Sequence, residues 1–276
     1  MQCNKCRAQL EPGKTRCRAC GSWTWVSQAI TPFVSLADVP DDDETARLTR
    51  NHFWAKLIGG GFVKGCVYLM AGEPGAGKST ISLQIADACA GETGLPTLYL
   101  NVEEKASRIK ARSQRLGCKN FDQIILPRDP ITPELEILES TGPVGLVVID
   151  SLSALARRNH LVAVEICNRA TSYAQSTETA VFIVDHVTKD EDFSGLMTLQ
   201  HAVDTTMYFR ADFKKKTRAI HTNKDRNGDG YVSMDVRMTA NEGIVPDVDP
   251  VTGIAPPMVT PDAPVSSTHV IEEGSA

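Results

Sequence analysis

The sequence has few of the features that mark a membrane or secreted protein. None of its apolar runs approaches the roughly 18 residues that a membrane-spanning helix needs. The N-terminus, Met1 to Cys6, contains no apolar segment of the kind found in a secretory signal. No internal repeat is visible either. These absences predict a cytoplasmic protein with no membrane partner, and the content of 42% hydrophobic and 23% charged residues is that of a globular chain.

Basic residues are absent from the C-terminal part of the chain. Residues 241–276 contain six acidic side chains and no Lys or Arg. Removing these six charges from the net charge of −5 leaves +1 for residues 1–240. The chain therefore has no general positive field, and a nucleic-acid partner would have to bind a local basic patch.

The distribution of residue types divides the 276 residues into four parts. Four cysteines cluster near the N-terminus, a polar and acidic stretch follows, and the last part has six prolines and little periodicity. The length is sufficient for one α/β core and a small additional module. We expect a cysteine module at 1–25, a linker at 26–48, a core at 49–242 and a largely disordered acidic tail at 243–276.

Within the core, short aliphatic runs alternate with helix-like stretches. Near-continuous apolar runs such as Gly145 to Asp150 are typical of parallel strands that helices cover on both faces. After residue 200 the runs are close together, which favours antiparallel strands at one edge of the same sheet. The predicted class is α/β, with a mostly parallel sheet. Its expected parallel strands are 66–71, 97–102, 123–126, 145–150 and 181–185, and its expected antiparallel strands are 203–209, 217–223 and 231–238.

The most specific motif is a phosphate-binding loop, G-x-x-x-x-G-K-[ST], between the first expected strand and a helix-like segment. Glycines let backbone N–H groups point at a triphosphate, and the helix N-terminus adds a positive end. Lys78 would reach the β- and γ-phosphates, and the Ser79 hydroxyl would hold Mg²⁺. The strand–loop–helix context disfavours the alternative of a glycine-rich turn without nucleotide. The expected ATP-binding residues are Gly72, Glu73, Pro74, Gly75, Ala76, Gly77, Lys78, Ser79 and Thr80.

Polar side chains follow three other expected strands, whose carboxyl ends would line one crevice. Asp150 is expected to hold the water shell of Mg²⁺ beside Ser79. Glu103 is favoured as the base that deprotonates the attacking water, with Glu104 as the alternative. Glutamates are also common at helix N-termini, and this would explain the presence of whichever of the two is not the base. His186 would contact the γ-phosphate and transmit its loss, although a lone histidine is more often structural.

A pair of cations lies further along the chain. Lys224 and Arg226 are two apart on an extended segment and so point the same way. Such a fork can stabilise transition-state charge on the nucleotide of a neighbouring subunit, whereas the alternative is a surface turn with solvated charges. The stretch from Asp225 also resembles the start of a calcium loop, but Val236 stands where calcium needs a bidentate Glu. No calcium site is expected.

The cysteine module contains two C-x-x-C pairs. Cys3 with Cys6 and Cys17 with Cys20 would grip two sides of one tetrahedral ion, which favours a structural Zn²⁺ without an open coordination position. A module of this size cannot build its own core, so the metal would supply the folding energy. A disulfide or redox pair is disfavoured in a chain without a secretion signal.

Candidate contacts to nucleic acid are fewer and less specific. Arg157 and Arg158 lie in a loop beyond the Asp150 strand, and Lys189 follows the His186 strand. Cations in such loops could track a phosphate backbone. The basic segments 105–115 and 214–216 are more often solvated surface.

Together these motifs resemble the bacterial DNA-repair ATPase family RadA, also called Sms. The likeness spans roughly residues 1–240 and rests on Cys17 to Trp23, Gly59 to Gly65, Tyr99 to Glu104 and His186 to Lys189. The resemblance implies a RecA-type ATPase core in a homo-hexameric ring around single-stranded DNA. It also implies branch migration during recombination, with a recombinase as a candidate partner.

Two features depart from the RadA pattern. RadA has Lys-Asn-Arg-Phe-Gly where this chain has Lys224 to Gly228, whose ending is closer to that of the DnaB-type replicative helicases, in which the Lys and Arg serve the adjacent subunit's ATP. The chain also ends where RadA continues into a Lon-protease-like domain. The leading expectation is a DNA-dependent ATPase that acts as a translocase or helicase on single-stranded or branched DNA. The alternatives are a DnaB-type replicative helicase and a RecA- or KaiC-like oligomer that ATP switches and that does not translocate.

Overall fold

The computed structural model describes residues 3, 6–9, 17–20, 47–128, 131–186 and 193–247. The chain divides into two compact units, Met1–Thr45 and Ala46–Ala276. Most of the expected linker, the expected tail beyond residue 247 and Lys189 lie outside the described residues. Of the helices in the described ranges, none combines the length and the apolar character needed to cross a membrane.

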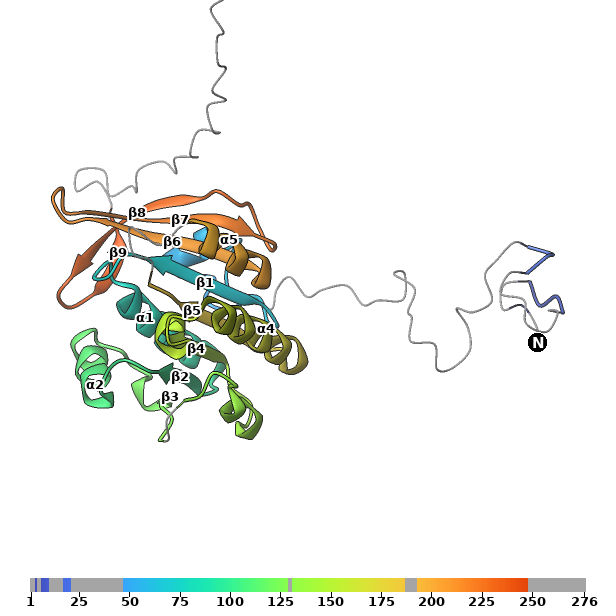
Figure 1. Ribbon diagram of the computed structural model, residues 1–276, viewed down its shortest axis with the longest axis horizontal. Coiled ribbons are helices and arrows are strands. Elements are labelled where there is room, and N and C mark those ends of the chain that lie inside the picture. The colour runs from blue at the N-terminus through green and yellow to red at the C-terminus, as the bar shows by residue number, and fades with distance from the viewer. Residues whose placement is uncertain are drawn as a thin grey trace, which may run out of the picture. The chain divides into compact units, whose positions relative to one another are not determined.

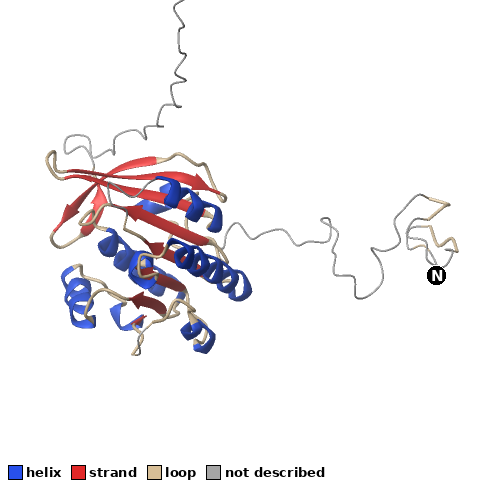
Figure 2. Cartoon of the chain, in the orientation of Figure 1, coloured by secondary structure: helices blue, strands red, loops and turns tan. Residues whose placement is uncertain are grey.

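A nine-stranded sheet forms the centre of the second unit (Figures 1 and 2). Its order is β3-β2-β4-β5-β1-β6-β7-β8-β9. Each strand from β3 to β1 in this order pairs in parallel with the next one, so β6 is the last strand of the parallel part. Strands β6, β7, β8 and β9 pair with one another in an antiparallel way. The strands are β1 Val67–Gly72, β2 Thr97–Asn101, β3 Ile124–Ile125, β4 Leu146–Asp150, β5 Ala180–Val184, β6 Thr205–Asp212, β7 Thr217–Asp225, β8 Ser233–Thr239 and β9 Gly243–Pro246.

The expected α/β class is confirmed, with two corrections in the C-terminal part of the core. The segment expected as an antiparallel strand at 203–209 forms β6, which pairs in parallel with β1 and antiparallel only with β7. A further strand, β9, extends the sheet beyond the expected end of the core at residue 242. This short strand is held by its pairing with β8 and by Gln84, whose side chain bonds the backbone of Glu242 and Ile244. Neither interaction leaves a periodic pattern in the sequence.

Helices cover both faces of the parallel part of the sheet (Figure 2). The apolar cluster on one face includes residues of α1, α2 and the 3₁₀ helix η3, and the cluster on the other face includes residues of α3, α4, α5 and the 3₁₀ helix η5. The helices are η3 Phe53–Leu57, α1 Lys78–Thr93, α2 Ala106–Arg115, η4 Phe121–Gln123, η5 Glu136–Ser140, α3 Leu152–Leu155, α4 His160–Thr177 and α5 Phe193–Ala202.

Strand β4 shows why the apolar run at 145–150 forms a strand that is buried on both faces of the sheet. Successive side chains of a strand point to opposite faces. Val148 accordingly packs in the cluster around α1, whereas Val147 and Ile149 pack in the cluster around α4. All three are fully buried, so a continuous apolar run is needed in place of an alternating one.

The register of the parallel strands brings four loops to one edge of the sheet. Asn101 at the end of β2 pairs with Asp150 at the end of β4, Asp150 pairs with Val184 at the end of β5, and Val184 pairs with Met70 of β1. The segments that follow these strands therefore emerge side by side. Ligands of open α/β sheets bind at such carboxyl ends.

A glycine-rich segment before β1 packs against the turn after β7. A Cβ on Gly59 would lie 2.6 Å from the Asn227 carbonyl oxygen and 2.8 Å from the Gly228 Cα. Arg47 joins the two segments, since its guanidinium donates to the carbonyl oxygens of Gly59 at 2.6 Å and of Asn227 at 2.9 Å. The turn that follows Arg226 is thus anchored to the segment that leads into β1.

Candidate nucleotide-binding site

The phosphate-binding loop joins β1 to α1 at the carboxyl edge of the sheet. Its backbone passes too close to neighbouring groups for side chains at two positions. A Cβ on Gly72 would overlap the Phe209 carbonyl oxygen, and one on Gly77 would lie 2.7 Å from the Cδ1 of Ile244. Gly77 also has a φ of +120°, which glycine adopts readily. Because Gly77 offers no side chain to cap α1, the N-terminus of this helix is open to an anion.

Lys78 is the first residue of α1 and folds back over the loop. Its Nζ donates to the carbonyl oxygens of Gly72 at 2.6 Å and of Glu73 at 2.9 Å. The residue is only 3% exposed. Burial lowers the pKa of Lys78 to about 8, an effect that the nearby Asp150 carboxylate partly offsets. Additional negative charge at this point would favour the ammonium form, which is the interaction that a triphosphate supplies.

Asp150 ends β4 and is buried beside the loop, with 7% of its surface exposed. Its Oδ2 accepts a 2.7 Å hydrogen bond from the hydroxyl of Tyr99, and the Ser79 side chain also bonds it. Burial raises the pKa of Asp150, and the bonds from Tyr99 and Ser79 oppose that rise. The Ser79 hydroxyl and the Asp150 carboxylate are oxygen ligands of the kind that Mg²⁺ prefers, so the residues fit this ion.

The two glutamates after β2 have different surroundings. Glu104 forms an ion pair with Arg112, whose Nη2 lies 2.7 and 2.8 Å from the two carboxylate oxygens. Glu103 accepts a hydrogen bond from the Ser151 hydroxyl and lies 3.4 Å from the Nε2 of His186. Its side chain is 42% exposed. Both carboxylate oxygens of Glu104 are thus bound by Arg112, whereas Glu103 is the more exposed of the two glutamates at the cavity.

His186 follows β5 and is oriented by a buried carboxylate. Its backbone N–H donates to the Oδ1 of Asp185 at 2.8 Å, and this oxygen also accepts a bond from the backbone N–H of Ser153 at 3.0 Å. Burial raises the pKa of Asp185. The Nε2 of His186 faces Glu103, while its Nδ1 is buried and has no hydrogen-bond partner within the described part of the chain. His186 therefore lies beside Glu103 in the lining of the cavity described next.

These side chains surround a cavity of about 260 Å³ at the carboxyl edge of the sheet. The structure thus brings together the loop, Asp150, both glutamates and His186 from four strand ends. Glu73 belongs to the loop but turns away, since its Oε2 accepts a bond from the backbone N–H of Ala211 at 2.9 Å. The cavity is lined by Gly75, Gly77, Lys78, Ser79, Thr80, Asn101, Glu103, Glu104, Arg112, Asp150, His186 and Met238.

The expected cationic fork is not among the residues that line this cavity. The Nζ of Lys224 donates to the carbonyl oxygens of Gln200 at 2.5 Å and of Val203 at 2.6 Å, at the end of α5. Arg226 pairs with Asp204 at 3.0 Å and has a side chain that is 58% exposed. Both side chains therefore reach the turn between α5 and β6 of their own subunit.

The expected DNA contacts Arg157 and Arg158 lie in the turn between α3 and α4. Both are exposed, and both have positive φ values, of +50° and +59°. Asn159 caps α4 by accepting bonds from two backbone N–H groups of its first turn. Leu161, in that turn, is 79% exposed. The turn thus presents two cations and an apolar side chain to solvent, and Lys189 cannot be placed beside them because it lies outside the described residues.

The sequence pattern assigns no site role to Tyr99, Ser151 or Asp185. Tyr99 reads as one more residue of an apolar strand, and its hydroxyl meets Asp150 only because β2 and β4 are neighbours. Ser151 and Asp185 directly adjoin two of the expected residues at strand ends, and this position is the one signal that could have identified them.

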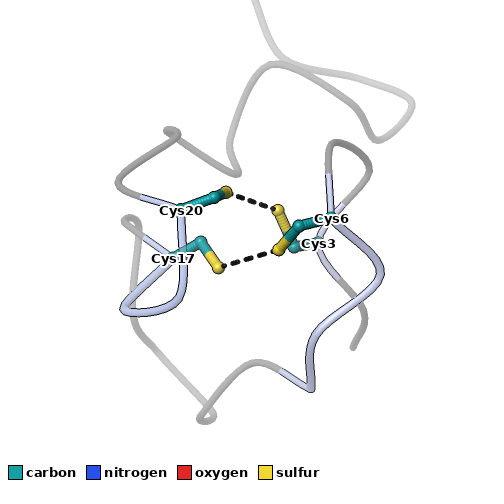
Figure 3. A group of neighbouring side chains, drawn as sticks. All are labelled: Cys3, Cys6, Cys17 and Cys20. Atoms are coloured by element: carbon teal, nitrogen blue, oxygen red, sulfur yellow. Dashed lines mark hydrogen bonds between the residues drawn. The ribbon is translucent and has the colours of Figure 1, made fainter.

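The first unit brings the sulfur atoms of four cysteines together (Figure 3). Cys3 and Cys20 have an Sγ–Sγ distance of 3.6 Å, and so do Cys6 and Cys17. These distances exclude disulfides, which need about 2.05 Å. They approach the edge of about 3.8 Å that a tetrahedron with 2.3 Å metal–sulfur bonds requires. The donor set and its spacing therefore fit a structural Zn²⁺.

The fold and the site define a class of protein. A mostly parallel sheet with a phosphate-binding loop after β1, an acid at the end of β4 and antiparallel strands beyond β6 is the RecA-type P-loop ATPase fold. Residues 32–192 match the family model described as "AAA domain". The chain belongs to this family of ATPases.

Curated relatives confirm the expected likeness to RadA. The chain is 29% identical over 245 residues to the DNA repair protein RadA of Aquifex aeolicus (strain VF5), with 82% of this chain and 54% of that protein covered. It is 31% identical over 252 residues to the DNA repair protein RadA of Mycobacterium tuberculosis (strain ATCC 25618 / H37Rv), with 82% and 52% covered. The chain therefore spans about half the length of the curated relatives that it matches.

Two solved structures share the fold. The KaiC-like protein PH0186 of Pyrococcus horikoshii OT3 has a TM-score of 0.60 and 18% identity, with 72% of this chain and 98% of that chain covered. The RadB recombinase has a TM-score of 0.56 and 19% identity, with 71% and 98% covered. At these identities the likeness shows the RecA-type fold alone.

The contrast between the two glutamates generates a first prediction. Glu103→Gln is expected to lower ATP hydrolysis by about 10²- to 10⁴-fold, because it removes a positioned base, while nucleotide binding is retained. Glu104→Gln is the matched control, since it makes the same change one residue away and weakens only the pairing with Arg112. It should lower hydrolysis by less than about tenfold. Phosphate release and binding of a fluorescent ATP analogue measure both effects, and a larger loss in Glu104→Gln would reverse the assignment.

The cysteine cluster generates a second prediction. Elemental analysis should find one zinc ion per chain, and Cys17→Ser should lose it because three sulfurs cannot close a tetrahedral site. Cys118→Ser, the same change at a half-buried cysteine of the second unit, should keep it. Nucleotide binding should survive metal removal, since Ala46–Ala276 has its own apolar core. Purified chain without zinc would contradict the assignment.

Proposed function

We propose that the chain is a DNA-dependent ATPase, a motor of recombination and repair that moves along single-stranded or branched DNA as a ring of identical subunits. The observation that carries the proposal is the separation of its charged groups. Lys78, Asp150 and Glu103 surround a cavity with a phosphate-binding loop, whereas Lys224 and Arg226 lie apart from that cavity in the same subunit. This separation supports a shared site, in which a neighbouring subunit would supply its Lys224 and Arg226 to the nucleotide.

The phosphate-binding loop and Lys78 would bind ATP. The open N-terminus of α1 offers backbone N–H groups to the phosphates, and the Lys78 ammonium would exchange its two loop carbonyls for phosphate oxygens. Ser79 and Asp150 would hold Mg²⁺, which neutralises phosphate charge when bound. Glu103 would orient a water molecule and accept its proton. His186, in contact with Glu103, would respond to the loss of the γ-phosphate.

The neighbour's contribution is proposed to come mainly from Arg226. Its side chain is 58% exposed, and its partner Asp204, which is only 13% exposed, keeps a second donor in the backbone N–H of Val67. Arg226 can therefore leave Asp204 for phosphate oxygens of an adjacent subunit at little cost. Lys224 is held more firmly by two carbonyl oxygens, and burial lowers its pKa. We propose that a homo-hexameric ring places these groups at each interface.

Contact with DNA is proposed at the turn between α3 and α4. Arg157 and Arg158 are exposed there, and they follow directly on the element after Asp150. Two adjacent cations suit a phosphate backbone. The names of the curated relatives, which are DNA repair proteins, support DNA as the partner.

The test of the function is the rate of ATP hydrolysis with and without single-stranded DNA. We expect DNA to raise the rate, and less so at high salt, because phosphate contacts are screened. Arg157→Ala with Arg158→Ala should lose this stimulation. Lys214→Ala with Lys215→Ala removes the same charge from another exposed turn and should keep it. If the rate of ATP hydrolysis is the same with and without DNA, the proposed motor function is wrong, and an oligomer that ATP switches is favoured.

A mixing experiment tests the shared site. Arg226→Ala should lose hydrolysis by at least about 10³-fold, as expected for an arginine supplied from a neighbour. Mixing it with Glu103→Gln should restore part of the activity, because an interface between the loop of one variant and Arg226 of the other is intact. If Arg226 acted within its own subunit, every site in the mixture would keep one defect and no activity would return.

A further inference from the structure

Tyr99 carries a buried hydroxyl that plays no part in the proposed function. The residue lies in β2, in the apolar cluster on the α1 side of the sheet, and is 1% exposed. Its hydroxyl donates to the Oδ2 of Asp150 at 2.7 Å and lies 2.9 Å from the Oγ of Ser82, which is fully buried. Since a phenol has a single proton and gives it to Asp150, Ser82 is the donor to Tyr99. Three polar side chains thus form a chain within an otherwise apolar cluster.

This chain of hydrogen bonds joins the two elements that carry the expected Mg²⁺ ligands. Ser82 lies on α1 at three residues beyond Ser79, so the two share one face of the helix. Asp150 ends β4, the strand next to β2. Tyr99 therefore ties the helix of one ligand to the carboxylate of the other.

The chemistry of the phenol suits this position. A phenol is neutral at physiological pH, so the Tyr99 hydroxyl remains a donor. A donor to Oδ2 fixes the rotation of the Asp150 carboxylate and leaves Oδ1 for other partners. A phenylalanine would fill the same volume with no polar atom to satisfy, so packing alone does not account for the hydroxyl.

We propose that Tyr99, supported by Ser82, is a positioning residue that fixes the Asp150 carboxylate toward Mg²⁺–ATP. Tyr99 touches neither the metal nor the nucleotide and acts only through Asp150. The inference rests on the proposed function, since it names what sets the geometry of that site. Partners of metal ligands of this kind typically change metal affinity about 10- to 100-fold when they are removed.

The test compares nucleotide binding over a range of Mg²⁺ concentrations. In Tyr99→Phe the Mg²⁺ concentration that gives half of the metal-dependent gain in affinity for a fluorescent ATP analogue should rise about tenfold. Affinity in excess EDTA should stay within about twofold of the wild-type value, because the loop and Lys78 are unchanged. A purely structural role for Tyr99 would lower both affinities together and leave the Mg²⁺ midpoint in place.

Tyr68→Phe is the matched control. Tyr68 is a fully buried tyrosine of β1 in the same apolar cluster, and its hydroxyl accepts a 2.8 Å bond from the backbone N–H of Val63. Loss of the Tyr68 hydroxyl should lower the free energy of unfolding by an amount similar to that in Tyr99→Phe and leave the Mg²⁺ midpoint unchanged. Ser82→Ala, which removes only the donor to Tyr99, should raise the midpoint by about two- to threefold and decides the question if Tyr99→Phe does not fold.

The outcomes separate this inference from the function on which it rests. Wild-type affinity that gains from Mg²⁺, together with an unshifted midpoint in Tyr99→Phe or Ser82→Ala, would overturn the positioning role and leave the proposed ATPase standing. The same shift in Tyr68→Phe would also overturn it. A wild-type chain that binds no ATP analogue at any Mg²⁺ concentration would overturn the proposed function, and the inference with it.

Discussion

Burial of β1, β2, β4 and β5 on both faces is the constraint on which the rest of the structure depends. Their side chains are almost all excluded from water, so the strands must be apolar throughout and their connections must supply covering helices on both faces. Polar residues can appear only where the strands end. Because these strands are parallel, the ends that face the cavity lie at one edge, and the polar residues of four segments meet there.

The same burial sets the electrostatics of the cavity. Exclusion of water lowers the pKa of Lys78 and raises those of Asp150 and Asp185, because each charged form loses hydration. Glu104 is paired with Arg112, whereas the carboxylates of four other residues act on a single lysine, Lys78: Glu73, Glu103, Asp150 and Asp185. Such a site needs a cation before it can accept a triphosphate. The proposed Mg²⁺ ligands beside the loop, the Ser79 hydroxyl and the Asp150 carboxylate, would therefore contribute to nucleotide binding.

Much of the fold could be predicted from the sequence, and the elements that were predicted wrongly or missed have a common cause. Long apolar runs and the loop motif identify the central strands and α1 because those signals are local. The direction of β6 is different, since parallel pairing with β1 depends on the crossover through α5 and not on the strand's own residues. β9 is too short to show a period and exists because β8 and Gln84 supply its partners. Partners distant in sequence leave no mark on the local pattern.

The chemical groups of this protein can be identified from the amino-acid sequence alone: a phosphate-binding loop, an acid at the end of β4, a pair of glutamates after β2 and two pairs of cysteines. Each is specified by residues a few positions apart, whose backbone geometry is set locally. Which of these groups come into contact depends on the folded arrangement of the strands. Arg112 pairs with Glu104 and leaves Glu103 facing the cavity, Tyr99 reaches Asp150, and the fork of Lys224 and Arg226 lies apart from its own subunit's loop. These choices depend on strand adjacency, which arises when separate segments bury a common core.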